Sequence, residues 1–281
     1  MGIEPSLLCR AGGRLLEGPL WAAETRQLRF VDIRAGELLS LSLDTGRLER
    51  TVFGRSCSAW VERRGGGSVV ACEDALVFLD ARGREEHQLP LERELKANRA
   101  NDAKCDPAGR LWVGTMSEAE DARSGSLYRI EPGSVTSVVD GVTVSNGLGW
   151  SPDGGSMYHV DSPTRRIDVF DYDLATGTPS ARRALVDTSE LAGFPDGLAV
   201  DVEGCVWVAF WDGRSVHRFS PDGELVGTVA VPAARPTSCA FFGDGLERLA
   251  ITTAAAEDGT GGDVFVCDPG VAGMEVEAFH G

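Results

Sequence analysis

Short stretches in which apolar and polar residues alternate recur along the chain, and each follows a turn rich in glycine and aspartate. Two early copies are loose, around residues 24–31 and 64–71. Four later copies are clear, with turns at residues 106–109, 151–154, 201–204 and 243–245. Alternation with period two, bounded by Gly, Asp and Pro, is typical of β-strands joined by hairpin turns. The pattern predicts six strand-rich repeats, spaced by about 40 to 50 residues.

A second hairpin follows the first in the clearer copies, with strands expected around residues 127–130, 167–173 and 216–225. Four strands per repeat form the blade of a β-propeller, and no sustained helical periodicity competes with this interpretation. The predicted fold is therefore an all-β, six-bladed β-propeller with four antiparallel strands per blade. We expect a single domain that spans residues 1–281.

Side-chain oxygens occupy one column when the repeats are aligned eight residues upstream of the turn glycine. The clear turns give Asn101, Asn146, Asp196 and Thr237, and pattern similarity adds Glu17 and Ser56. The first strand of each propeller blade is innermost, so equivalent positions on these strands form a ring at one mouth of the central channel. The alignment predicts a ring of oxygen donors there.

The composition of this ring favours a hard divalent cation. Two carboxylates, two amides and two hydroxyls suit calcium, magnesium or manganese, and the two carboxylates would neutralise the ion. None of the four histidines falls in the column, which argues against a histidine-rich zinc site. We interpret Ser56 and Thr237 as channel lining rather than ligands. The Pro-Asp-Gly strings that contain Pro152 and Pro221 are interpreted as hairpin turns.

The overall composition narrows the class of partner. The formal charge is −16, from 43 acidic and 27 basic residues, so a phosphate backbone would be repelled and no nucleic acid is expected. The seven cysteines are scattered and form no CxxC pair, which fits reduced thiols. No signal peptide or membrane span is evident. We expect a cytoplasmic protein without membrane contact, as a monomer or a weak homodimer.

Several strings together resemble the senescence-marker-protein, gluconolactonase and luciferin-regenerating-enzyme family, which includes regucalcin. The matching strings occur in family order and cover most of the chain. They are Leu16-Glu-Gly-Pro-Leu-Trp21, Phe30-Val-Asp-Ile33, Arg99-Ala-Asn-Asp102, the segment 106–116, Ser145-Asn-Gly-Leu148, Phe170-Asp-Tyr-Asp173, Pro195-Asp-Gly197 and Thr237-Ser-Cys239.

The resemblance implies a six-bladed propeller with one divalent metal ion held by Glu17, Asn146 and Asp196. Calcium is the first expectation, with zinc, manganese or magnesium as alternatives. The family's substrate-facing arginine and asparagine match Arg99 and Asn101.

A further acidic substrate contact occurs in some members of the family. It would be Glu118, although Glu120 also fits, or the contact would be absent. Ala103 replaces the glycine that usually follows Asn-Asp in the family, which bears on the backbone beside the substrate.

These residues permit metal-assisted opening of a small sugar-type lactone, with Asp196 as the candidate general base. No Gly-x-Ser-x-Gly elbow supports a serine nucleophile. Two other classes remain open: a calcium-binding regulatory propeller without turnover, and a protein-interaction scaffold. A scaffold has no need of the oxygen column, and turnover separates the other two.

Overall fold

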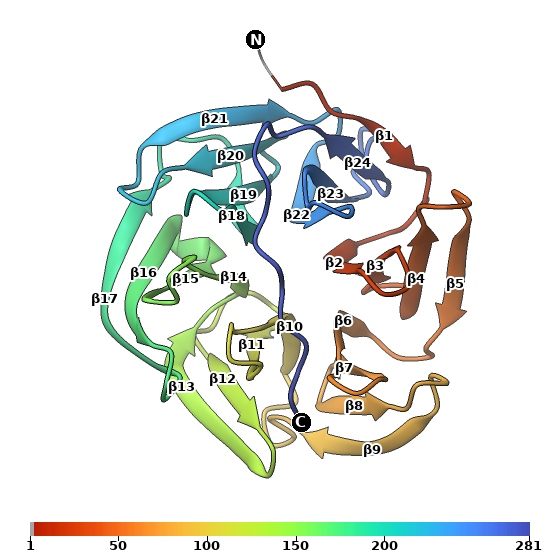
Figure 1. Ribbon diagram of the computed structural model, residues 1–281. Coiled ribbons are helices and arrows are strands. Elements are labelled where there is room, and N and C mark those ends of the chain that lie inside the picture. Colours follow the sequence, from red (N-terminus) through yellow and green to blue (C-terminus); the bar gives the residue numbers. More distant parts are fainter. Residues whose placement is uncertain (1–2) are drawn as a thin grey trace.

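Six four-stranded antiparallel sheets stand around a central axis in the computed structural model, which describes residues 3–281 (Figure 1). This arrangement confirms the predicted all-β, six-bladed propeller. The only helical element among the described residues is a short 3-10 turn, η1 (Ser162–Thr164). None of their helices is long and apolar enough to cross a membrane.

The first three blades each take four consecutive strands, listed from the inner to the outer edge of the ring. Blade 1 has β2 (Leu16–Ala22), β3 (Gln27–Asp32), β4 (Glu37–Ser42) and β5 (Leu48–Val52). Blade 2 has β6 (Cys57–Glu62), β7 (Ser68–Cys72), β8 (Ala75–Leu79) and β9 (Glu85–Pro90). Blade 3 has β10 (Asn98–Cys105), β11 (Leu111–Ser117), β12 (Gly125–Glu131) and β13 (Ser134–Val142).

The last three blades complete the ring, and the sixth takes its outer strand from the N-terminal part of the chain. Blade 4 has β14 (Ser145–Trp150), β15 (Ser156–Asp161), β16 (Arg166–Asp173) and β17 (Thr178–Asp187). Blade 5 has β18 (Phe194–Val200), β19 (Val206–Trp211), β20 (Ser215–Phe219) and β21 (Leu225–Ala230). Blade 6 has β22 (Arg235–Phe242), β23 (Arg248–Ala254), β24 (Val264–Cys267) and β1 (Ser6–Cys9).

The pairing of β1 with β24 closes the ring, because it joins the two ends of the chain in one sheet. This pairing covers the outer edge of β24 and gives blade 6 its fourth strand. Apolar side chains of neighbouring blades pack together between the sheets. Leu76 and Phe78 of blade 2, for example, share one buried cluster with Leu111 and Val113 of blade 3.

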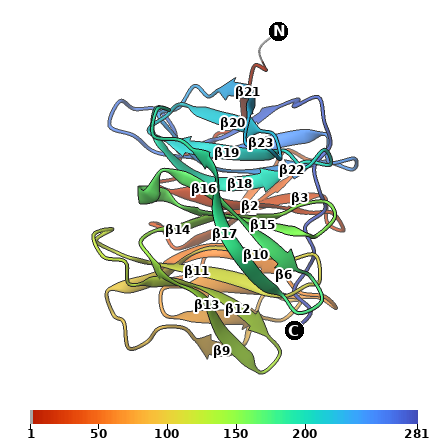
Figure 2. The same cartoon turned by 90° about the vertical axis from the view of Figure 1, so that its left-hand side faces the viewer.

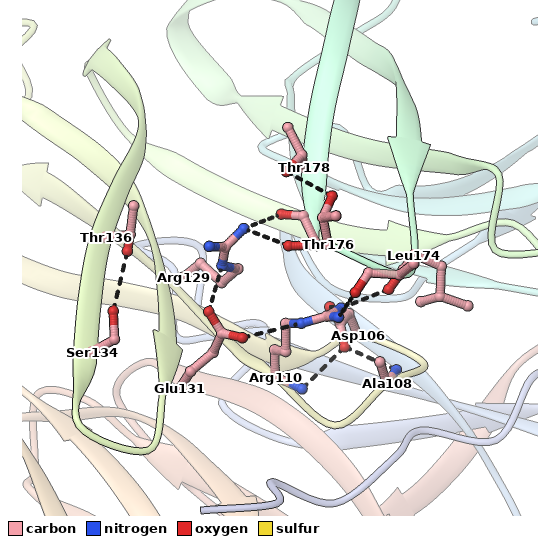
Figure 3. A network of polar contacts seen from close by, with 12 residues as sticks. Asp106, Ala108, Arg110, Arg129, Glu131, Ser134, Thr136, Leu174, Thr176 and Thr178 are labelled. Atoms are coloured by element: carbon pink, nitrogen blue, oxygen red, sulfur yellow. Dashed lines mark hydrogen bonds and ion pairs between the residues drawn. The ribbon is translucent and has the colours of Figure 1, made fainter.

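Buried aspartates in the turns form hydrogen bonds both with the turn backbone and with side chains of the core. The buried Asp106 carboxylate accepts hydrogen bonds from the amides of Ala108 and Arg110, from the indole of Trp112 at 3.3 Å and from the Tyr172 hydroxyl at 2.5 Å. Arg110 pairs with Asp106 at 2.9 Å and also donates to carbonyls of the loop between β16 and β17 (Figure 3). This network therefore ties blade 3 to blade 4.

The segment after β24, residues 268–281, runs across the middle of the ring in Figure 1. Backbone hydrogen bonds fasten it to three blades: the amides of Met274, Phe279 and His280 donate to the carbonyls of Val200, Glu62 and Gly109. Residues Met274 to Ala278 line a cavity of about 1040 Å³ on this side. One end of the channel is therefore covered by the chain itself.

Candidate metal and substrate site

The other end of the channel opens into a cavity of about 680 Å³, where the innermost strands begin. Its lining includes five of the six residues of the predicted column: Glu17, Ser56, Asn101, Asn146 and Asp196. They come from five blades and are far apart in sequence, but the ring places them around one space. The alignment thus found the positions that the propeller brings together.

Each innermost strand carries an irregularity in its pairing close to this cavity. The register with the second strand of the blade shifts between Glu17 and Leu20 in β2, between Asn146 and Leu148 in β14, and around Asp196 in β18. A bulge interrupts the ladder and re-aims the side chain that it carries, and bulges are common next to active sites. The shifts explain how residues within buried strands present polar groups to the channel.

Two carboxylates meet at this cavity in a poorly solvated place. Burial raises the pKa of Glu17 to about 8, and the nearby charge of Asp102 adds to the shift, while the Gly18 amide at 2.9 Å opposes it. Burial also raises the pKa of Asp196 well above its ordinary value, and the charge of Glu17 is the next cause. A bound cation would remove the cost of keeping both groups ionised.

Asn146 is held by hydrogen bonds that fix which way its amide points. Its nitrogen donates to the Ser162 hydroxyl at 2.9 Å, and that hydroxyl donates to the Pro195 carbonyl at 2.6 Å. The Asn146 side-chain oxygen accepts one bond, from Asn101 at 2.8 Å. A carbonyl oxygen has two lone pairs, so this oxygen keeps one for a further partner.

These donors fit a hard divalent ion. The carboxylates of Glu17 and Asp196 accept no hydrogen bond from any described side chain, so their oxygens are available, and the third donor is an amide oxygen. Among residues 3–281, no group of three or more His, Cys, Asp or Glu is arranged to hold a metal. Metal binding at this place would therefore rely on Asn146 beside the two carboxylates.

Arg99 and Asn101 lie next to these groups on β10. Arg99 donates to the Asn101 side-chain oxygen at 2.7 Å, and Asn101 donates to the Ser145 carbonyl at 2.9 Å as well as to Asn146. Burial lowers the pKa of the Arg99 guanidinium, and the charges of Glu118 and Glu120 oppose that shift. The arginine is therefore a half-buried cation at the wall of the cavity.

Both acidic candidates for the substrate side reach this cavity. Glu118 pairs with Arg99 at 3.4 Å and remains largely exposed, and Glu120, in the same turn after β11, also lines the space. The structure brings both residues to the mouth of the cavity. Of the described residues, Glu118 alone makes an ion pair with Arg99.

Thr237 differs from the expectation that it lines the channel. Its hydroxyl is fully buried, donates to the Leu16 carbonyl at 2.6 Å and lies 2.8 Å from the Thr252 hydroxyl. The residue joins blade 6 to blade 1 beneath the ring. The alignment identified the equivalent position in blade 6, but the Thr237 hydroxyl forms hydrogen bonds inside the protein and does not face the channel. Ser56 does line the cavity, as expected.

Two charged residues beneath the ring were not identified from the sequence. Asp102 and Lys104 line the cavity on the far side of the channel, and the Lys104 ammonium donates to the Leu198 carbonyl of blade 5 at 2.7 Å. Burial lowers the pKa of Lys104, and the charge of Asp102 opposes that shift. The charge of Glu17 also opposes that shift, so the ammonium lies close to the carboxylates of both Asp102 and Glu17.

The fold agrees with the comparisons with known proteins. The sequence profile of the SMP-30/gluconolactonase/LRE-like region matches residues 15–255. The chain belongs to this family. Its relatives include regucalcin of Bos taurus, 35% identical over 92% of this chain and 88% of the relative.

A second relative, the pentonolactonase XacC of Haloferax volcanii, is 36% identical over 89% of this chain and 85% of the relative. Among solved structures, a calcium-binding protein, regucalcin, from Agrobacterium tumefaciens superposes with a TM-score of 0.92. That structure is 28% identical and covers 100% of this chain and 97% of its own. The likeness extends through the whole propeller.

Proposed function

We propose that the protein is a divalent-metal-dependent hydrolase that opens small sugar-type lactones. The observation that carries the proposal is the pair of carboxylates, half-buried Glu17 and buried Asp196, which line one cavity together with Asn146 and Arg99. Two relatives support it through their names, one a pentonolactonase and one a calcium-binding protein. Calcium is the ion proposed first, with zinc, manganese and magnesium as alternatives.

A lactone is a cyclic ester, so its hydrolysis builds negative charge on the carbonyl oxygen. A divalent ion held by Glu17, Asn146 and Asp196 would supply Lewis acidity to that oxygen and acidify water. Asp196 is the proposed general base, because its carboxylate faces the cavity and can accept the proton of the attacking water. Asn101 positions the amide of Asn146 through the 2.8 Å hydrogen bond.

Arg99 is proposed to bind the substrate rather than the metal. Its guanidinium reaches the cavity between Asn101 and Glu118, where it can donate to hydroxyl or carbonyl oxygens of a sugar ring. Glu118 would accept from a substrate hydroxyl on the same side. Because metal binding and substrate binding are assigned to different residues, substitutions at Arg99 and at the metal ligands should have different effects on turnover and on metal affinity.

The experiment is a panel of sugar lactones, including glucono-1,5-lactone, crossed with calcium, zinc, manganese and magnesium. We expect Arg99→Ala to lower kcat/KM by about 100-fold, since a positioning contact is lost, with metal affinity unchanged. Arg123→Ala is the control, because this exposed arginine does not line the cavity. Titration of calcium by calorimetry reports the affinity.

Two outcomes would contradict the proposal. Pure protein that opens no lactone with any of the metals would remove the enzyme assignment, and calcium binding without turnover would support a regulatory role instead. Equal loss of turnover and of metal affinity in Arg99→Ala would show that the arginine serves the metal.

A further inference from the structure

Two arginines outside the metal and substrate set stand at the mouth of the cavity. Arg34 lies in the turn between β3 and β4, and Arg55 lies in the connection between β5 and β6, directly before Ser56. Both line the cavity. Neither makes an ion pair or a side-chain hydrogen bond to oxygen or nitrogen with the described residues.

The backbone fastens these two turns against each other. Gly36 has φ of +64°, and a Cβ atom there would lie 2.7 Å from the Arg55 carbonyl oxygen, so only glycine lets the turns approach this closely. The Phe53 amide also donates to the Gly36 carbonyl at 2.8 Å. The loops that carry Arg34 and Arg55 are thus held side by side.

The Arg55 guanidinium is partly buried and forms no ion pair with the described residues. Its Nε and Nη2 atoms are buried and have no oxygen or nitrogen partner within residues 3–281, and the weakly accepting thiol of Cys72 lies close by. The charges of Asp74 and Glu85 help to raise the pKa of Arg55, but neither carboxylate lies within ion-pair range. Nη1 is not among these buried, unpartnered atoms, and the residue lines the cavity.

The other charged groups of the lining either have a partner of opposite charge, are assigned to the proposed ion, or are exposed to solvent. Arg99 has Glu118 as its partner, and Glu17 and Asp196 belong to the proposed ion. Glu73 and Glu120 are exposed to solvent. Arg34 and Arg55 therefore line the cavity without an ion-pair partner among the described residues, in a chain with a net charge of −16, and an anionic ligand can supply the acceptor that they lack.

We propose that the substrate is an acidic sugar lactone, whose free carboxylate binds Arg55 and Arg34 while its ring carbonyl faces Glu17, Asn146 and Asp196. This rests on the proposed lactonase function and narrows its substrate class to lactones of sugar diacids. A guanidinium binds a carboxylate through charge-assisted hydrogen bonds, and a neutral hydroxymethyl group gains much less from the same contact.

The experiment compares glucono-1,4-lactone with glucaro-1,4-lactone, which differ by a hydroxymethyl group against a carboxylate at the far end of the chain. We expect the wild-type protein to prefer the acidic lactone by tenfold or more in kcat/KM, about the gain of one good charge pair. Arg55→Gln should erase this preference and change turnover of the neutral lactone by less than about threefold. Arg34→Gln should reduce it by a smaller factor, because Arg34 is exposed.

Arg82→Gln is the matched control, since Arg82 is an exposed arginine in the turn between β8 and β9, away from the cavity. Melting curves of each variant confirm folding, and Arg34→Gln keeps the test open if Arg55→Gln is unstable. Rising salt should weaken the preference of the wild type.

The outcomes separate this inference from the proposed function. No hydrolysis of any lactone would overturn both. Hydrolysis of the neutral lactone at least as fast as of the acidic one, or an acid preference that survives in Arg55→Gln, would overturn the inference alone. A third arm uses 6-phosphoglucono-1,5-lactone against glucono-1,5-lactone, and a larger preference for the phosphate would overturn the choice of a carboxylate.

Discussion

Glu17 shows at the scale of one residue how the site departs from ordinary strand chemistry. The side chain belongs to β2, between the fully buried Leu16 and the close-packed Gly18, yet it carries a carboxylate whose pKa burial raises to about 8. An unpaired acid at such a place costs stability unless a proton or a cation neutralises it. Metal binding at Glu17 would therefore remove this cost and stabilise the folded protein.

This raised pKa predicts a pH effect on the metal-free protein. Glu17 binds its proton more tightly when folded than when unfolded, so its contribution to stability is complete below about pH 4.5 and is lost as the pH rises through about 8. We expect the melting temperature of the wild type to fall relative to that of Glu17→Gln across this window, as measured by calorimetry without metal. Parallel pH profiles of the two proteins would contradict the assignment.

Residues of the column were predictable because each sits at a fixed distance from a turn glycine. Asn146 and Asp196 share this spacing with Asn101, and the period of the repeat carries all three to one mouth. Asp102 and Lys104 were not predictable in this way, because a charge that occurs in only one of six blades has no pattern behind it. Their burial follows from the bulge in β10 and from contact with blades 4 and 5.

At the scale of the element, the turn between the first two strands of a blade is the unit that the sequence encodes best. The Asp106 carboxylate binds the turn amides and the indole of Trp112, and Asp201 repeats this with the amides of Glu203 and Cys205 and the indole of Trp207 at 2.9 Å. The same spacing from aspartate to tryptophan in two blades shows why these strands could be identified.

Asp106→Asn tests how much the hydrogen bonds of this turn contribute to the stability of the protein. An amide cannot accept all the hydrogen bonds of the buried carboxylate, and Arg110 would lose its buried partner. We expect a loss of about 3 kcal/mol in the free energy of unfolding, measured by denaturant titration. Asp153→Asn, in an exposed turn of blade 4, should cost about 1 kcal/mol or less. Equal losses in the two variants would show that the buried network adds nothing.

Two elements that lack the repeat pattern could not be predicted from the sequence. The strand β1 (Ser6–Cys9) joins blade 6 through pairing with β24, a contact between the two ends of the chain that no local signal specifies. The segment 268–281 has no strand periodicity, but it crosses the ring and holds three blades by backbone hydrogen bonds. Long-range closure depends on the whole ring, so local patterns could not predict it.

At the scale of the whole molecule, the two ends of the channel differ: one is covered by the C-terminal segment and the other is open. Seen from the side in Figure 2, the blades stack as twisted sheets along the molecule, and the C-terminal segment runs along one face. That face is closed by residues Met274 to Ala278, whereas the cavity of about 680 Å³ has none of them in its lining. Substrate access is therefore expected from the metal side alone.

An ion held by Glu17, Asn146 and Asp196 would connect blades 1, 4 and 5 across this opening, so its effect on stability belongs to the whole ring. The most direct measurement is the melting temperature with and without calcium, for the wild type and for Asp196→Ala. We predict a rise of several degrees in the wild type when calcium exceeds its Kd about 100-fold, equivalent to about 2.7 kcal/mol, and no rise in the variant. A wild-type melting curve that no divalent metal shifts, or a variant that responds equally, would contradict the account.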